Sequence, residues 1–193
     1  CDVFWQQAHS AARLHFLSVE KHPFTVRELA QAQEQAGLAS NVSRALCEQW
    51  PPLVSGIHRL FFADGRITLT LGFGDVETVL HDFDARADAI FLDGFSPSRN
   101  PEMWSAGVFR RLAALSHGTT TVATWSVSGA VREGLTRAGF QVQKATGFAE
   151  KREMLTGQFR GQAPAAASLP AERRALVIGA GLAGTGIAVA AAA

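Results

Sequence analysis

The chain has 193 residues, of which 47% are hydrophobic and 18% charged, so it can bury one full core and disorder is not expected. Its net charge of +1 does not by itself favour or exclude a nucleic-acid partner. Two cysteines, Cys1 and Cys47, and six scattered histidines give neither a disulfide framework nor a metal-ligand spacing. This pattern predicts a reducing, cytoplasmic compartment and no metal site.

The charge is distributed unevenly along the chain. Residues 1–100 contain 8 Lys and Arg against 12 Asp and Glu, whereas residues 101–193 contain 10 against 5. A basic half could meet a polyanion, but a solvated basic face is the favoured alternative. The sequence has no initiator methionine and no signal peptide, and both ends fall inside apparent secondary structure, so we expect a piece of a longer protein.

Apolar strand patterns alternate with helical patterns, which predicts an α/β fold with a mostly parallel, doubly wound sheet. Strands are expected at 13–19, 56–62, 67–73, 89–92, 120–125, 140–144 and 152–159, and helices at about 25–37, 42–50, 76–83, 101–115 and 128–139. Asp64–Gly65 predicts a hairpin between the second and third strands, inserted into the parallel sheet. An antiparallel strand is possible at the end of the sheet.

The amino-acid composition changes after the last of these strands. Residues 161–174 have the Ala, Pro and Ser content of a linker. Residues 175–178 then predict a strand, followed by GAGLAG and an Ala-rich helical tail. This context indicates a dinucleotide-binding turn with three motif glycines, Gly179, Gly181 and Gly184. Because residues 175–193 are uncharged, a transmembrane span is the rival interpretation, which the glycines disfavour.

Three carboxylates follow three of the predicted strands: Glu20, Asp75 and Asp93. Because ligands of open α/β sheets bind at the carboxyl ends of strands, these side chains could converge on one crevice. Glu20 could accept hydrogen bonds from both hydroxyls of a ribose, and Asp75 could accept one from an adenine amine. Asp93 is followed by Gly94 and Phe95, and a carboxylate beside an exposed aromatic could form a reaction site.

Each acid also has a structural explanation. Glu20 would favour the N-terminus of the helix that follows it, and for Glu20 alone this is the preferred interpretation. Asp75 could cap the next helix. Asp93 and Gly94 could form an ordinary turn before Pro97.

Five segments carry a resemblance to a known family: FLSVEKHPF at 16–24, FGD at 73–75, DAIFLDGFSPSRNPEMW at 88–104, ATWSVSGAVREGLTRAGF at 123–140 and GFAEKREML at 147–155. On these segments the chain resembles the bacterial bifunctional enzymes that build 5-methylaminomethyl-2-thiouridine in tRNA. The resemblance implies a class I S-adenosylmethionine-dependent methyltransferase domain at 1–160, a linker at 161–174 and the start of an FAD-dependent oxidoreductase domain at 175–193.

The same resemblance implies a reaction and roles for the site residues. The FAD domain would remove a carboxymethyl group from the wobble uridine of tRNA, and the methyltransferase domain would then methylate the amine of 5-aminomethyl-2-thiouridine. Glu20 would hold the ribose of S-adenosylmethionine and Asp75 its adenine region. Asp93 would bind the reacting amine and Phe95 the base, while the three motif glycines (Gly179, Gly181 and Gly184) would bind FAD. No membrane and no metal are implied.

One departure from the family pattern concerns the cofactor. Methyltransferases of this class place a glycine-rich loop after their first strand, and both are expected to precede Cys1. We therefore expect this chain to bind S-adenosylmethionine poorly and to carry no flavin, which tight binding in calorimetry would contradict. Two alternatives remain open: a nucleotide-dependent oxidoreductase whose upstream part only positions substrate, and a non-catalytic binding domain with a degenerate pocket.

Overall fold

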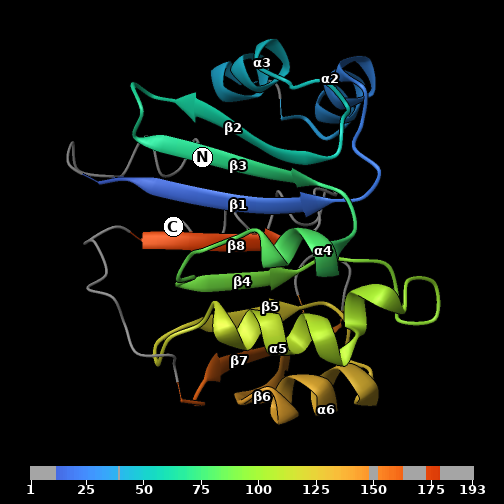
Figure 1. The fold of residues 1–193 in the computed structure, drawn as a ribbon. Coiled ribbons are helices and arrows are strands. Elements are labelled where there is room, and N and C mark those ends of the chain that lie inside the picture. The colour runs from blue at the N-terminus through green and yellow to red at the C-terminus, as the bar shows by residue number, and fades with distance from the viewer. Residues whose placement is uncertain (1–11, 39, 148–151, 163–172, 179–193) are drawn as a thin grey trace.

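A computed structural model describes residues 12–38, 40–147, 152–162 and 173–178 (Figure 1). The chain forms an 8-stranded sheet in the order β2-β3-β1-β8-β4-β5-β7-β6. The strands are β1 (Leu14–Glu20), β2 (Gly56–Phe62), β3 (Ile67–Phe73), β4 (Ala89–Leu92), β5 (Thr121–Thr124), β6 (Phe140–Thr146), β7 (Glu153–Phe159) and β8 (Arg173–Ile178). The helices are α2 (Val26–Gln35), α3 (Asn41–Glu48), α4 (Val76–His81), α5 (Ala106–Ala114) and α6 (Gly129–Arg137), with a short 3-10 helix, η1 (Glu102–Trp104). The predicted α/β class is confirmed.

Strand directions divide the sheet into a parallel centre and antiparallel ends. β3, β1, β8, β4 and β5 run parallel, whereas β2 is antiparallel to β3, and β7 is antiparallel to both β5 and β6. The β2–β3 connection has left-handed φ angles of 58° at Ala63, 55° at Asp64 and 79° at Gly65. Asp and Gly tolerate this conformation, which explains why the chain reverses at Asp64–Gly65.

Two groups of buried side chains hold the helices on the sheet. The larger group joins α4, α5 and α6 to the central and β6–β7 strands, and it includes Leu80, Ile90, Leu112 and Leu135, which have no exposed area. These three helices lie in a row over one face of the sheet (Figure 1). The smaller group packs α3 and Trp50 against β2 and β3, at the end of the sheet where α2 and α3 lie (Figure 1).

The helix expected at 101–115 is divided in the structure. Ser105 lies between η1 and α5 with extended backbone angles, φ −71° and ψ 156°. Its Oγ accepts a hydrogen bond from the backbone N–H of Val108 at 3.1 Å, so Ser105 caps a new helix. Trp104 therefore belongs to η1 and not to α5, so the prediction of one continuous helix at 101–115 is wrong.

β8 is the largest difference between the sequence-based prediction and the structure. The sequence analysis placed this strand at the start of a second domain, but in the structure it pairs in parallel with β1 on one side and β4 on the other. Without a strand there, β1 and β4 would leave unpaired N–H and C=O groups in the middle of the sheet. The apolar run Ala175–Ile178 has the composition typical of a parallel strand in the middle of a sheet.

Candidate functional site

The strand register brings the predicted acids to the same edge of the sheet. Ile178, the last residue of β8, pairs with Val19 of β1 and with Leu92 of β4. Glu20 and Asp93 each come one residue later, on opposite sides of the end of β8. Since neighbouring strands are about 4.8 Å apart, the backbones of these two acids are separated by ~10 Å.

The ends of β1 and β3 are joined directly. The backbone N–H of Gly74 donates to the carbonyl oxygen of Glu20 at 3.0 Å. Gly74 has a φ of +145°, which favours glycine, so the chain can turn there and carry Asp75 beside the end of β1. Lys21 Nζ lies 3.4 Å from Asp75 Oδ2 across the same gap. Glu20, Lys21 and Asp75 therefore form one polar group.

Both acids of this group also make local hydrogen bonds. Glu20 Oε1 accepts from the backbone N–H of His22 at 2.8 Å, and Asp75 Oδ1 accepts from that of Glu77 at 3.0 Å. Asp75 is thus the cap of α4, as its structural explanation required. A carboxylate offers about four acceptor positions, so one local bond leaves capacity for a ligand on each acid.

The structural explanation of Glu20 is wrong. The helix after β1 is capped by Thr25, which forms a capping box with Glu28. Glu28 Oε2 accepts from the Thr25 backbone N–H and hydroxyl, each at 2.8 Å, and these hydrogen bonds lower the pKa of Glu28 below its usual value. Glu20 instead shapes the turn at the end of β1.

On the other side of β8, the loop after β4 carries Asp93 and Phe95. Asp93 is partly buried and directly follows Leu92, which is buried in the large core. Phe95 is 69% exposed, the most exposed of the large apolar side chains in the described part of the chain. The backbone of Phe95 is nevertheless fixed, since its carbonyl oxygen accepts a hydrogen bond from Trp104 Nε1 at 3.0 Å. The loop thus presents an aromatic ring on an anchored backbone.

Sequence reasoning missed three residues at this edge: Lys21, Met103 and Trp104. The position of Lys21, next to a strand-end acid, was a usable signal for an ion pair. Met103 and Trp104 gave no such signal, because the continuous helix predicted at 101–115 gave no reason to place them beside the Phe95 loop.

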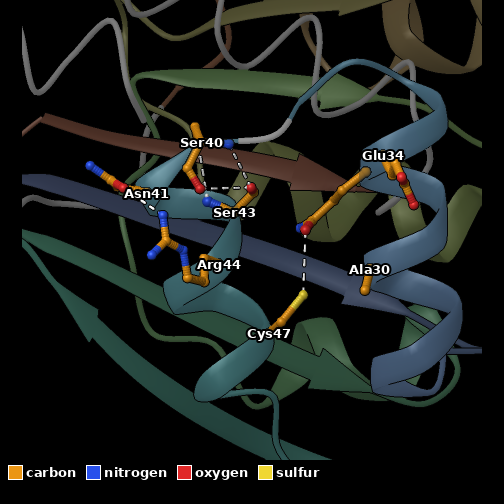
Figure 2. A pocket seen from close by; sticks show the side chains of 8 residues that line it. Ala30, Glu34, Ser40, Asn41, Ser43, Arg44 and Cys47 are labelled. Carbon is orange, nitrogen blue, oxygen red and sulfur yellow. Dashed lines mark hydrogen bonds between the residues drawn. The ribbon is translucent and has the colours of Figure 1, made fainter.

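A separate hollow lies between α2 and α3 (Figure 2). None of its lining residues is a predicted site residue, and several of its polar groups form hydrogen bonds with one another. Ser40 and Ser43 exchange backbone-to-side-chain hydrogen bonds at 2.9 and 3.1 Å. Cys47 Sγ donates to Gln33 Oε1 at 3.4 Å, and burial, with a smaller contribution from Glu48, raises the pKa of the Cys47 thiol. A thiol that stays protonated is a poor nucleophile.

The motif glycines Gly179, Gly181 and Gly184 lie outside the described residues. Among residues 12–38, 40–147, 152–162 and 173–178, no His, Cys, Asp and Glu side chains group into a metal site. The helices described there are also too short or too polar to cross a membrane.

Comparison with known families decides the class of the protein. The model of a family described as S-adenosyl-L-methionine-dependent methyltransferases matches residues 38–160. The chain belongs to this family. The matched range contains Asp75, Asp93 and Phe95, and Glu20 precedes it.

Curated relatives extend the similarity of this methyltransferase over most of its length. It is 53% identical over 176 residues to the tRNA 5-methylaminomethyl-2-thiouridine biosynthesis bifunctional protein MnmC of Azoarcus sp. (strain BH72). This match covers 91% of the chain and 28% of that relative. A protein of the same name from Cupriavidus metallidurans is 52% identical over 183 residues, covering 91% of the chain and 27% of the relative. The resemblance stated from the sequence is confirmed, and the chain spans little more than a quarter of these relatives.

A solved structure supports the fold of the methyltransferase. The crystal structure of MNMC2 from Aquifex aeolicus superimposes with a TM-score of 0.57 at 22% sequence identity. The match covers 80% of this chain and 47% of that chain. At this identity the likeness concerns the fold alone.

Proposed function

We propose that this chain carries the methyl-transfer site of a bifunctional tRNA-modifying enzyme. The substrate is the wobble uridine of tRNA, and the acceptor is the primary amine of 5-aminomethyl-2-thiouridine. Family membership and the names of the relatives support this function. The single observation that carries it is the convergence of Glu20, Asp75 and Asp93 on one edge of the sheet, with Phe95 beside them.

The acids beside β1 and β3 suit the nucleoside part of S-adenosylmethionine. The carboxylate of Glu20 would accept hydrogen bonds from the ribose hydroxyls, and Asp75 would accept one from the adenine region. A group of carboxylates also favours a cationic sulfonium over a neutral ligand. Lys21 balances part of this negative charge.

Asp93 suits the reacting amine. In the transfer, the neutral amine nitrogen forms a bond to the methyl carbon while the bond from sulfur to that carbon breaks. The nitrogen then loses one proton, which the Asp93 carboxylate accepts. Asp93 would also orient the nitrogen lone pair, and most of the rate enhancement would come from this positioning. Phe95 would stack on the extruded base.

The second activity of the relatives requires a further domain. From the sequence we propose that residues 175–193 begin an FAD-binding oxidoreductase domain, which would remove the carboxymethyl group before methylation. This boundary assigns residues 1–160 to the methyltransferase domain and residues 161–174 to the linker. It would therefore assign β8 to the second domain, and another strand would have to pair with β1 and β4 in its place. The oxidoreductase-only alternative is not favoured, because the methyltransferase model matches residues 38–160.

Asp93→Asn tests the assignment, with Asp64→Asn as the matched control. Asp64 lies in the β2–β3 turn, where asparagine tolerates the observed φ of 55°. In the natural protein that contains this sequence, we expect Asp93→Asn to lower methyl transfer from labelled S-adenosylmethionine to amine-bearing tRNA by about 10²- to 10⁴-fold, the usual range for loss of a proton acceptor. Asp64→Asn should leave it unchanged. Equal rates in the two variants would refute the role of Asp93.

A further inference from the structure

The loop that carries Phe95 is held by residues outside the predicted site. Trp104 Nε1 donates a hydrogen bond of 3.0 Å to the Phe95 carbonyl oxygen. One residue earlier on each segment, Met103 lies so close to Gly94 that any Cβ at position 94 would overlap the Met103 sulfur. Two consecutive residues of η1 thus contact two consecutive residues of the loop.

Within the described part of the chain, the side chain of Phe95 itself is little packed. The Phe95 ring is 69% exposed, so ring packing contributes little to its position. The backbone N–H groups of Arg99 and Asn100 both donate to the Ser96 carbonyl oxygen, at 2.8 and 3.0 Å, which closes a turn just after Phe95. These bonds organise the turn but do not attach it to the domain.

η1, in contrast, is firmly attached. Met103 is buried in the large core and Trp104 packs against it. Ser105 Oγ donates to Glu77 Oε2 of α4 at 3.2 Å, and Gly107 lies against the same carboxylate. α4 is the helix capped by Asp75. A continuous set of contacts therefore runs from the cap of α4, through η1, to the Phe95 loop.

We propose that Trp104 is a positioning residue for methyl transfer, which sets the place of Phe95 and Asp93 relative to the acids beside β1 and β3. The proposal rests on the proposed function. The indole N–H of Trp104 binds the backbone carbonyl of Phe95. The Phe95 ring can therefore stay exposed to stack on a base while the backbone that carries it is held in place. Met103 supports the same loop through its contact with Gly94.

Trp104→Phe tests the proposal, because phenylalanine keeps an aromatic ring and loses the N–H donor. Trp50→Phe is the matched control. Trp50 Nε1 also donates to a backbone carbonyl, that of Phe24, at 2.8 Å, and Trp50 also packs on a core. Both variants lose one comparable hydrogen bond, so a purely structural role predicts the same effect in both.

In the natural protein that contains this sequence, we expect Trp104→Phe to lower kcat/KM for amine-bearing tRNA ~5-fold, the effect of one lost neutral hydrogen bond. The KM for S-adenosylmethionine should not change. Trp50→Phe should leave both parameters near wild type. Amide hydrogen exchange at Arg99 and Asn100 should become faster in Trp104→Phe only.

Equal kinetics and equal loop exchange in the two variants would overturn the role of Trp104. If the wild-type protein transfers no methyl group, the proposed function fails, but the exchange measurement still decides whether Trp104 fixes the loop. Faster exchange with unchanged kcat/KM would show that Trp104 orders the loop without serving the reaction, which also overturns the proposal.

Discussion

The ends of β1 and β3 hold their acids by a different means from the end of β4. Beside β1 and β3, local backbone N–H groups bind the side chains of Glu20 and Asp75 directly. Beside β4, a distant indole binds the backbone of the loop and leaves the Phe95 side chain exposed. On the proposed cofactor side, the acid side chains are thus bound by backbone groups two residues away, whereas on the proposed substrate side the loop backbone is bound by a side chain nine residues away.

This difference has a mechanistic meaning. A side chain that serves as a helix cap is rigid as soon as the helix forms, which suits a nucleoside that must bind the same way each time. A loop held through its backbone, by Trp104 at Phe95 and by Met103 at Gly94, can still adjust its exposed side chains to a large ligand. β8 lies between the two sides and sets the distance between them.

The largest effect is expected from Leu176→Pro, which would disrupt β8, the strand between the two sides. Proline removes a backbone donor from a central strand, which should cost at least ~3 kcal/mol and abolish cooperative unfolding in urea. Ala167→Pro, in the segment expected to be a linker, is the control and should have no such effect. An unchanged urea midpoint for Leu176→Pro would show that this strand is not part of the sheet and would favour the domain boundary proposed from the sequence.

Two glycine substitutions compare the two sides directly. A Cβ at Gly72, on β3, would overlap Val79 of α4, which is buried, so Gly72→Ala should lower the free energy of unfolding by about 1–3 kcal/mol. A Cβ at Gly94 would meet the end of the flexible Met103 side chain, so Gly94→Ala should cost less stability. Gly94→Ala should, however, reduce the rate of methyl transfer more strongly than Gly72→Ala does.

Urea unfolding and methyl-transfer kinetics on both variants are the measurement. If Gly94→Ala proves the more destabilising and Gly72→Ala the more damaging to kcat, the assignment of a stable cofactor side and an adjustable substrate side is reversed.

A smaller effect separates the observed capping role of Asp75 from its proposed role in cofactor binding. Asparagine is as good a helix cap as aspartate, whereas Asp75→Ala loses the bond to the Glu77 N–H and should cost ~1 kcal/mol of stability. Both variants remove the charge that faces Lys21 and should raise the KM for S-adenosylmethionine alike. An unchanged KM in Asp75→Asn, measured in the natural protein, would leave Asp75 with a capping role only.

The smallest effect is expected at Cys47, between α2 and α3 and outside both sides of the site. Burial raises the pKa of this thiol, so folding favours its protonated form, and that contribution to stability declines as the pH rises above the ordinary thiol value of 9.0. In a Cys1→Ser background, iodoacetamide at pH 8 should modify Cys47 more slowly in the folded chain than in urea. Equal rates would show that the hollow does not shield the thiol.

Local patterns in the sequence predicted much of the fold. Apolar runs and helical patterns located the strands and most helices, and Asp64–Gly65 located the β2–β3 turn, because these features depend on residues close together in the chain. The helix at 101–115 was predicted too long, since the capping hydrogen bond from Val108 to Ser105 competes with a continuous helix.

For the site, the sequence by itself determined which residue types stand at the ends of the strands, because each acid directly follows an apolar run. It also determined the family, through several motifs in a fixed order. Only the tertiary structure decided what lies between those ends. β8 pairs with β1 and β4, although it lies more than eighty residues from β4, the nearer of the two strands in the sequence. The indole of Trp104 binds the backbone of Phe95 from another segment. Neither contact has a local pattern, because strand pairing and loop anchoring depend on which surfaces remain unpaired once the other elements have folded.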